Sequence, residues 1–539
     1  MLLVFVVALA IRLPHLASAP DDFHTMRQYH GQLLARWLHD AVAQGDTSAA
    51  AQGDTSAAAP RVDLEDTSLL EAPVLPAAST VGFLATGGES WWVPRSINVL
   101  AWLLGGWMLM RLCLESTGSR RAALVAAVCF LLAPFGVSLS RSVQPDTMMI
   151  VATIGAWWAA VRAVRAADEG AADEGAADEG AADEGAASVE EPVEEPVGEP
   201  EGEPVDGTDR AAVLALGIAT AFAVLVKGVA AFLIVPVVLA LLVGRHGWTQ
   251  LWRRRPLRVT VVAVALPSVL YYAASIALGA PLRGQLHSSV VPSMLVDPAF
   301  WSSWFTTVLS VVGLIGLCSL IAALTVCARG TLRSVLAGAT VGFVAMGLFF
   351  SYRSATHDYY AAPLIAVVAL AVGAVADRGL EQLERRSVRP AAAAAMALVL
   401  LAVGVGAMGR APRWAPTVTD ARRASIEAAA AELPPGGRVL MVDGHYGNQL
   451  RHDTGLRGAS WPTQADLDLD TLSGATAVDP SSRLDQLLDE GVAHLVTTID
   501  PSRVIDPSTA ALFELVEDCV VERVGEVRVV ELGPCVGRT

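Results

Sequence analysis

The 539-residue chain is 53% hydrophobic and only 17% charged, with a net charge of −16 and a mean hydropathy of +0.48. The charged fraction lies well below the roughly 25% of soluble globular domains, and the apolar residues come in long blocks, so we expect a polytopic α-helical membrane protein rather than a soluble enzyme. Much of the acidic excess falls in one low-complexity segment, and nothing indicates a nucleic-acid partner.

Eleven apolar segments approach the ~20 residues that a transmembrane helix needs. They lie near 1–19, 93–111, 121–138, 143–161, 211–226, 229–244, 258–279, 304–327, 332–350, 359–376 and 391–408. The two segments that flank Lys227-Gly228 are short enough to form one broken helix. Ala17-Ser18-Ala19 resembles a signal-peptidase site, but no basic segment precedes it, so an uncleaved helix is favoured.

The Arg-rich short loops set the predicted orientation, because such loops stay in the cytoplasm. With eleven spans, the four richest loops fall on one side, and the N-terminus lies with them. The C-terminal domain then lies outside the cytoplasm, as expected for a bacterial inner-membrane protein. The same outer face receives the loops that hold Asp22, Glu71, Arg141, Lys227 and His357.

Composition divides the chain into a membrane domain, residues 1–410, and a soluble domain, residues 411–539. The first external loop spans 20–92 and contains an eight-residue tandem duplication at 43–58. Residues 164–210 include four Ala-Ala-Asp-Glu-Gly repeats and are predicted to be a disordered acidic cytoplasmic linker, because such sequences bury little apolar surface.

Residues 411–539 have the pattern of a small α/β domain. We expect helices at 424–433 and 484–490, strands at 438–443 and 493–498, and a hairpin around Gly525. The six cysteines show no metal-binding or redox spacing. Cys519 and Cys535 are able to pair if this domain is extracytoplasmic, although spacing alone does not decide the pairing.

The densest set of ionisable groups lies directly after the first apolar segment, in Asp21-Asp22-Phe23-His24-Thr25-Met26-Arg27-Gln28-Tyr29. Thr25 and Gln28 have the spacing of a capping box, and the helix that they open is amphipathic, suited to the membrane interface. Asp21 and Asp22 precede its positive N-terminal end. The structural alternative is solvated loop charge with an ordinary helix cap, whereas charge beside a bilayer is often functional.

Further candidates lie in other loops on the predicted outer face. A structural explanation exists for each: an Arg and an Asp can pair and cap a helix, a Lys can extend to the headgroups, and Tyr is common at interfaces. Together, however, these loops combine carboxylates with cations. The candidates are Glu71, Arg141, Asp146, Lys227, Arg353, His357, Tyr359 and Tyr360.

Such a combination suits a reaction whose leaving group is a lipid-anchored phosphate. Phosphate leaves without protonation, so one general base can activate the attacking hydroxyl while cations stabilise the developing negative charge. A transporter would place its charges nearer the bilayer midplane. The carboxylates therefore favour an enzyme over a transporter.

The same residues resemble the membrane-embedded GT-C glycosyltransferases, in the protein mannosyltransferase and aminoarabinose transferase-like branch (family 39/83-type). The resemblance covers residues 1 to about 410. Its motifs, in family order, are Asp22 to Arg36, Leu70-Glu71-Ala72-Pro73, Gly87-Gly88-Glu89 through Arg95, Arg141 with Gln144-Pro145-Asp146, Lys227-Gly228, and His357-Asp358-Tyr359-Tyr360 with Pro363.

The resemblance implies a polyprenyl-phosphate-linked sugar donor and transfer, with inversion, to an envelope lipid, glycan or protein on the extracytoplasmic face. Asp22, or its neighbour Asp21, would be the general base. Arg27, His24, Lys227 and His357 would bind the donor phosphate, and Glu71 would position the acceptor or a metal. The remaining candidates for donor or acceptor binding are Gln28, Arg141, Asp146, Arg353, Tyr359 and Tyr360.

No cofactor is required by the sequence. Asp22, Glu71 and His24 carry donor atoms suited to a divalent cation, but no spacing rule demands one. Two other functions stay open at this point: a transporter or flippase of lipid-linked glycans, and an inactive scaffold for envelope assembly. Loss of transfer in Asp22→Asn would separate the enzyme from both.

Overall fold

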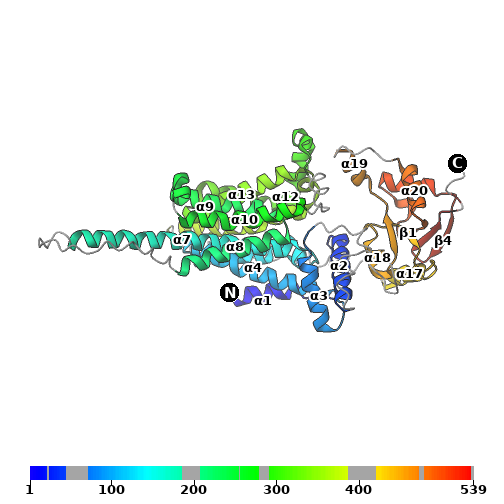
Figure 1. Ribbon diagram of the computed structural model, residues 1–539, viewed down its shortest axis with the longest axis horizontal. Helices are drawn as coiled ribbons and strands as arrows, with labels where there is room; N and C mark the ends of the chain where they lie inside the picture. The colour runs from blue at the N-terminus through cyan, green and yellow to red at the C-terminus, as the bar shows by residue number, and fades with distance from the viewer. Residues whose placement is uncertain are drawn as a thin grey trace.

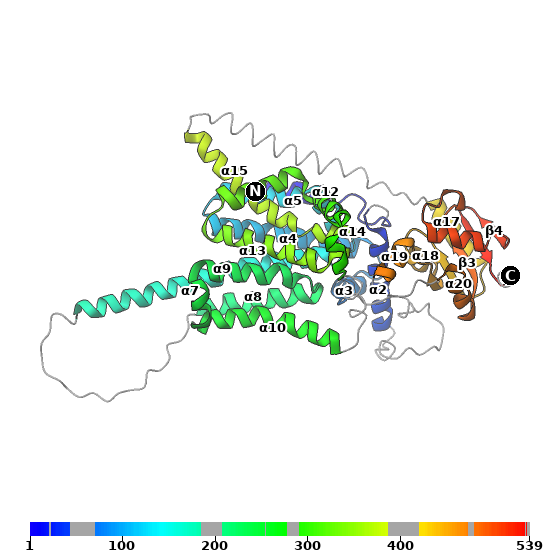
Figure 2. The same ribbon diagram turned by 90° about the horizontal axis from the view of Figure 1, so that it is seen from above.

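The computed structural model describes residues 1–20, 23–43, 71–184, 207–253, 255–277, 290–385, 420–472, 479–533 and 535. Within them, a bundle of long helices and a smaller domain built on a β-sheet lie end to end along the long axis of the molecule (Figure 1). Helix α2 (Thr25–Ala43) lies between the two parts and runs across the direction of the bundle helices (Figures 1 and 2).

The other helices up to residue 385 complete the bundle and its junction with α2. They are α1 (Leu2–Ala10), α3 (Val74–Thr86), α4 (Trp92–Thr117), α5 (Arg120–Leu132), α6 (Pro134–Ser140), α7 (Asp146–Glu184), α8 (Gly207–Val226), α9 (Ala230–Arg253), α10 (Arg255–Ala277), η1 (Pro292–Val296), α12 (Pro298–Ala322), η2 (Ala323–Cys327), α13 (Gly330–Phe349), α14 (Ser351–Thr356), η3 (Asp358–Ala361) and α15 (Leu364–Arg385). The multi-span helical architecture predicted from hydropathy is confirmed.

Seven of the described helical segments are long and apolar enough to cross a membrane. These are Trp92–Thr117, Asp146–Ala166, Ala230–Arg253, Arg255–Ala277, Pro298–Cys327, Gly330–Phe349 and Asp358–Arg385. The pair α5 and α6, bent by 59°, adds an eighth if it forms one span, and the apolar part of α8 is shorter. The predicted span at 391–408 lies outside the described residues, so the count of eleven stays a prediction.

The predicted span at 1–19 differs from the structure. Helix α1 covers only nine residues and gives way to turns before Pro14, which cannot continue a helix. The guanidinium of Arg12 is fully buried and donates to the carbonyls of Ala8 and Leu131 and to the hydroxyl of Ser140. The first segment is therefore anchored to the bundle by a buried cation.

The acidic repeats also differ from the prediction. Helix α7 continues to Glu184 and thus through the Ala-Ala-Asp-Glu-Gly repeats, where a disordered linker from residue 164 was expected. Ala and Glu are strong helix formers, which offsets the single Gly in each repeat. Residues 185–206 lie outside the described part of the chain.

Small residues bring α9 and α13 into close contact. Gly338 and Gly342 have the Gly-x-x-x-Gly spacing, and a Cβ at Gly342 would lie 2.1 Å from the carbonyl oxygen of Phe232. A Cβ at Gly338 would lie 2.6 Å from the carbonyl oxygen of Pro236. Such spacing lets the backbones of membrane helices approach closely, and here it fixes α9, the helix that follows Lys227.

The C-terminal part is an α/β domain with a five-stranded sheet in the order β2-β1-β3-β5-β4. Strand β1 pairs in parallel with β2 and β3, whereas β5 pairs antiparallel with β3 and β4. The strands are β1 (Arg438–Val442), β2 (Arg457–Ser460), β3 (Val492–Thr497), β4 (Val520–Val524) and β5 (Val527–Glu531), and the helices are α17 (Asp420–Ala431), α18 (Asn448–Thr454), α19 (Gln464–Leu472), α20 (Pro480–Asp489), η5 (Pro501–Arg503) and α21 (Pro507–Leu515).

Alternating residues of the central strand β1 enter two separate cores. Leu440 packs with residues of α20 and α21, and Met441 packs with residues of α17 and α18. A strand covered on both faces has the continuous apolar run that the sequence shows. The two predicted helices, the two predicted strands and the hairpin around Gly525 are all present.

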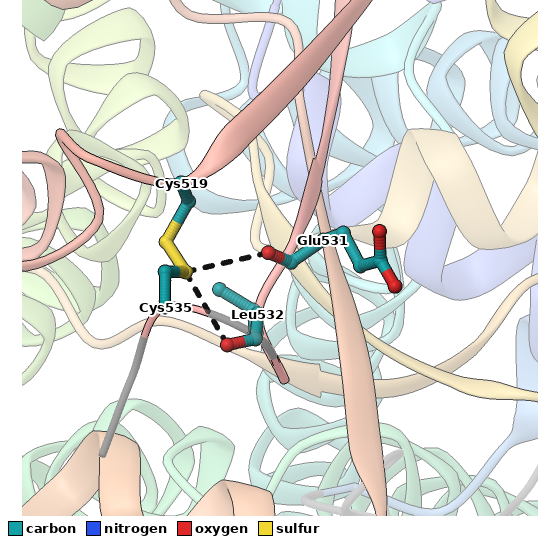
Figure 3. Close-up of a disulfide and its surroundings, with 4 residues drawn as sticks. All are labelled: Cys519, Glu531, Leu532 and Cys535. Carbon is teal, nitrogen blue, oxygen red and sulfur yellow. Dashed lines mark hydrogen bonds between the residues drawn. A yellow bond between two sulfur atoms is a disulfide. The ribbon is translucent and has the colours of Figure 1, made fainter. Parts of the chain in front are cut away.

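A disulfide links the start of β4 to the segment after β5 (Figure 3). Cys519 and Cys535 are separated by 5.2 Å between their Cα atoms, and the Cys535 sulfur also lies close to the carbonyl oxygens of Glu531 and Leu532. The pairing that the sequence left open is confirmed. Structural disulfides are typical of oxidising compartments.

The end of the bundle farther from the sheet domain carries a different set of polar contacts. Arg121 pairs with Glu384 at 2.7 Å, and the hydroxyl of Ser119 donates to Asp377 at 2.6 Å. Both contacts join the start of α5 to the last part of α15. The candidate residues of the predicted outer loops lie at the opposite end, next to α2.

Candidate active site

Helix α2 is fixed to the bundle by a buried glutamine. Gln28 donates to the carbonyl of Phe23 at 2.6 Å, and its side-chain oxygen accepts hydrogen bonds from Arg95 and from the backbone N–H of Val143. In the capping box predicted from the sequence, this side chain would instead bind the backbone N–H of Thr25. Gln28 therefore ties the start of α2 to the loop before α7, and so positions Arg27 relative to Asp146.

Two cations and two carboxylates from four separate segments meet at this end of the bundle. We call Arg27, Glu71, Asp146 and Lys227 the four-charge cluster. Lys227 Nζ lies 2.8 Å from Asp146 Oδ1 and 3.3 Å from Glu71 Oε1. Arg27 lies 3.5 Å from Glu71 and 3.8 Å from Asp146. The sequence predicted that these loops share one face, and the structure brings their side chains into contact.

The break between α8 and α9 places Lys227 in contact with the two carboxylates of the cluster. Helix α8 ends at Val226 and α9 begins at Ala230, so the Lys stands at the turn between two helices that pack against each other. Tyr272 donates its hydroxyl to the carbonyl of Gly228 at 3.0 Å, which satisfies one backbone group in the break. The sequence allowed the two segments beside Lys227 to form one broken helix, whereas in the structure they form a helical hairpin.

Two tyrosine rings cover the cations. Tyr359 lies under both Arg27, at 4.2 Å from its ring centroid, and Lys227, at 4.8 Å. Tyr360 lies 4.9 Å from Lys227. Cations are attracted to aromatic faces, more strongly where water is excluded. The rings therefore hold the two cations in place without neutralising their charge.

A second set of contacts surrounds the tyrosines. His24 lies 2.7 Å from Asp358, and Arg353 lies 3.3 Å from His357. Burial, followed by the charge of Arg353, lowers the pKa of His357 to about 3, so its ring is neutral near neutral pH. His24 adopts φ 46°, a left-handed conformation uncommon for a residue other than Gly and often found at functional sites.

A pocket of about 580 Å³ opens beside the cluster, between the bundle and the C-terminal domain. Its bundle side includes two members of the cluster and the residues around it: Arg27, His30, Glu71, Arg353, His357, Tyr359 and Tyr360. Its opposite wall comes from the C-terminal domain: Tyr446, Asn448, Arg451, Ala459, Ser460 and Arg483. Apolar side chains such as Leu34 and Leu75 complete the lining, so the pocket combines apolar surface with convergent charged groups, as a site for a charged ligand requires.

The wall from the C-terminal domain is built at the carboxyl edge of the parallel strands. The loop after β1 is held by Asp443, whose carboxylate accepts hydrogen bonds from the backbone N–H groups of His445 and Gly447. Arg451 donates to the carbonyl of Tyr446, which has φ 55°. Ligands of open α/β sheets bind at this edge, and here it faces the pocket.

The joint between bundle and domain centres on Glu89, in the connection that precedes α4. Arg36 binds this carboxylate at 2.5 Å, and Nε2 of His452 lies 3.0 Å from it. Arg36 also donates to the carbonyl of His452 at 2.8 Å, and Nδ1 of the same ring lies 2.8 Å from Asp453. We call these four residues the joint cluster. No sequence signal marked His452, because its partners on the bundle, Arg36 and Glu89, lie more than 360 positions away.

The joint cluster is expected to make the stability of the folded protein depend on pH. Burial raises the pKa of Glu89, but hydrogen bonds from His452 and Arg36 outweigh burial and lower it to about 2. A depressed carboxyl pKa stabilises the folded state above the ordinary value and loses that contribution as pH falls toward the folded value. The melting temperature of wild type should therefore exceed that of Glu89→Gln at pH 5, and the margin should shrink between about pH 4.5 and pH 2. A margin that does not depend on pH would contradict this assignment.

The remaining candidates are placed as follows. Arg141 is buried and donates to the carbonyls of Arg12 and Pro14, away from the described lining of the pocket. Asp21 and Asp22 lie outside the described residues, next to Phe23. Among the residues that the structure describes, no group of three His, Cys, Asp or Glu side chains is arranged to hold a metal ion.

Known proteins resemble this chain in part of its sequence and in its fold. The family model for dolichyl-phosphate-mannose-protein mannosyltransferases matches residues 71–171, a region that includes Glu71, Glu89, Arg141 and Asp146. ArnT from Cupriavidus metallidurans in the apo state matches with a TM-score of 0.57 and 18% identity over 98% of this chain and 97% of that chain. The chain has the GT-C fold. No match was found among curated protein sequences.

Two further GT-C structures are similar. ArnT from the same organism bound to undecaprenyl phosphate matches with a TM-score of 0.57 and 18% identity over 100% of this chain and 99% of that chain. The archaeal oligosaccharyltransferase AglB from Archaeoglobus fulgidus, in complex with an inhibitory peptide and a dolichol-phosphate, matches with a TM-score of 0.52 and 11% identity, covering 92% and 68% of the two chains. The GT-C resemblance seen in the sequence motifs is thereby confirmed at the level of fold.

Proposed function

We propose that this chain is an inverting glycosyltransferase that moves a sugar from a polyprenyl-phosphate-linked donor to an envelope acceptor, which is a lipid, a glycan or a protein. The observation that carries the proposal is the four-charge cluster, which lies beside a pocket between bundle and domain that Arg27, Glu71 and the two tyrosines line. The GT-C fold and the lipid phosphates bound by the two similar proteins support it.

The cations would bind the donor phosphate. Arg27 lines the pocket and offers a planar fork of N–H donors, whereas Lys227 acts as a point charge. Arg353 and the neutral ring of His357 stand nearby as further hydrogen-bonding groups. Groups that are already oriented toward developing negative charge lower the barrier without reorganising during the reaction.

In the proposed reaction, Asp22 takes the proton of an acceptor hydroxyl as its oxygen attacks the anomeric carbon of the donor sugar. The bond between that carbon and the phosphate oxygen breaks, and polyprenyl phosphate leaves as an anion beside Arg27 and Lys227. Direct displacement inverts the anomeric configuration. Asp21 is the alternative base, and both carboxylates precede the helix that carries Arg27.

We assign the pocket and the C-terminal domain to the extracytoplasmic side of a bacterial inner membrane. The Arg-rich loops belong to the other end of the bundle, where Arg121 pairs with Glu384. The disulfide between Cys519 and Cys535 supports an oxidising compartment for the domain.

The proposal is tested with purified protein in nanodiscs, a panel of polyprenyl-phosphate sugars and a crude envelope extract as acceptor. We expect release of polyprenyl phosphate from one donor, and a loss of at least about 100-fold in Asp22→Asn, since general-base catalysis contributes roughly 10²–10⁴-fold. Asp40→Asn, on the far part of α2, serves as the matched control and should retain activity. Folded wild-type protein that releases nothing from any donor would instead favour a transporter or flippase.

A further inference from the structure

The two carboxylates of the four-charge cluster are held unequally. Asp146 lies 2.8 Å from Lys227 and its side chain is 1% exposed, whereas Glu71 lies 3.3 Å from Lys227 and 3.5 Å from Arg27 with its side chain 18% exposed. Asp146 stands in the first turn of the long helix α7. Glu71 precedes α3 in a short bend. Asp146 is thus the fixed partner of the cations and Glu71 the looser one.

Glu71 lines the pocket and also contacts the buried cation Lys227. Glu71 and Arg27 line the pocket, whereas Lys227, with a side chain 5% exposed, is not among the described residues that line it. A phosphate that enters from the pocket therefore meets Arg27 and Glu71 first. Lys227 is covered by Glu71 and by the rings of Tyr359 and Tyr360, so the phosphate gains contact with it only if one of these groups moves.

Charge balance indicates which group moves. The cluster contains two cations and two carboxylates, so it is neutral as it stands. A phosphate that binds there adds negative charge beside carboxylates in a partly buried site, and like charges at close range are strongly disfavoured. Displacing Glu71, the more exposed carboxylate with the longer contacts, relieves this repulsion at the smallest loss of contacts.

We propose that Glu71 is an exchangeable counter-ion of the phosphate site. It pairs with Lys227 and Arg27 in the empty site, leaves them when a lipid-linked phosphate binds, and returns as polyprenyl phosphate departs. The tyrosine rings of Tyr359 and Tyr360 keep the two cations in place during the exchange. This inference rests on the proposed function for the identity of the phosphate.

The proposal gives Glu71 a role that opposes binding and promotes turnover. Glu71→Gln keeps the shape of the side chain and removes the competing charge. We expect the affinity for undecaprenyl phosphate to rise by about tenfold, because a competing unit charge close to two cations is gone. We also expect a lower KM for the lipid-linked donor with a lower kcat, because product release slows.

The test measures undecaprenyl phosphate binding to wild type, Glu71→Gln and Glu384→Gln in nanodiscs, together with steady-state kinetics. Glu384 pairs with Arg121 at the other end of the bundle, so its variant controls for loss of a carboxylate and should bind as wild type does. A Glu71 that only positions the acceptor would leave lipid-phosphate affinity unchanged in Glu71→Gln. A Glu71 that only holds the site together would lower it. Either result overturns the proposal.

A second variant covers the case in which Glu71→Gln fails to fold. Glu71→Asp keeps the charge on a side chain one methylene shorter, so its ion pair with Lys227 is weakened. The affinity for undecaprenyl phosphate should rise, but by a smaller factor than in Glu71→Gln. An affinity equal to or below that of wild type overturns the exchange. Failure of wild type and both variants to bind undecaprenyl phosphate at all overturns the proposed function itself.

Discussion

Replacing Lys227 with methionine will abolish sugar transfer and destabilise the protein. The substitution leaves the buried carboxylate of Asp146 without its 2.8 Å partner and removes a contact of Glu71. Removing one member of a buried ion pair costs about 3–5 kcal/mol, because the remaining charge is left uncompensated. Thermal unfolding in nanodiscs measures the stability, and release of polyprenyl phosphate measures the transfer.

The double variant Lys227→Met with Asp146→Asn separates the two effects. It removes both charges, so most of the stability should return, while transfer stays absent because the phosphate has lost a cation. Lys227 is the only lysine of a chain that has 38 lysine and arginine residues. Measuring transfer in Lys227→Arg therefore tests whether the site needs a compact point charge. Transfer at the wild-type level in Lys227→Met would contradict the proposed phosphate site.

Reversing the charge of Glu89 will release the C-terminal domain from the bundle and suppress transfer. Glu89→Arg places a third basic group beside Arg36 and His452, where a carboxylate now binds both. The pocket then loses the wall that carries Tyr446 and Arg451. We expect transfer to fall by about 100-fold or more, since misplaced binding groups cost this much in rate.

The reversal at Glu89 should spare the four-charge cluster. Undecaprenyl phosphate binding is therefore expected to remain within a few-fold of wild type, while hydrogen exchange at α18 increases. Glu522→Arg makes the same change at an exposed position of β4 and should alter neither quantity. Full transfer activity in Glu89→Arg, with α18 still protected, would show that the joint does not hold the domain.

The elements that the sequence predicted well are those with strong periodic signals. The long membrane helices follow from hydropathy, and β1 and β3 follow from short apolar runs bounded by turns. Strand β2 was missed because Arg457–Ser460 has no apolar run, and it becomes a strand only by pairing with β1. The short helices α18, α19 and α21 were also missed, since isolated helices of this length carry little local signal.

The candidate site was predicted in part. Loop charges placed Glu71, Asp146, Lys227 and the tyrosines on one face, but the sequence does not say which cation meets which carboxylate. Gln28 and Arg141 were also candidates for ligand binding; both donate to backbone carbonyls in the structure, and a role in binding stays a prediction. The joint cluster depends on the docking of a separate domain, which no local pattern encodes.

A structure of the protein in nanodiscs with undecaprenyl phosphate would show where the lipid phosphate binds. We expect phosphate density in the pocket within hydrogen-bond distance of Arg27 and Lys227, with the Glu71 carboxylate turned away from both. A phosphate bound elsewhere on the bundle, with Glu71 still paired to Lys227, would contradict this expectation.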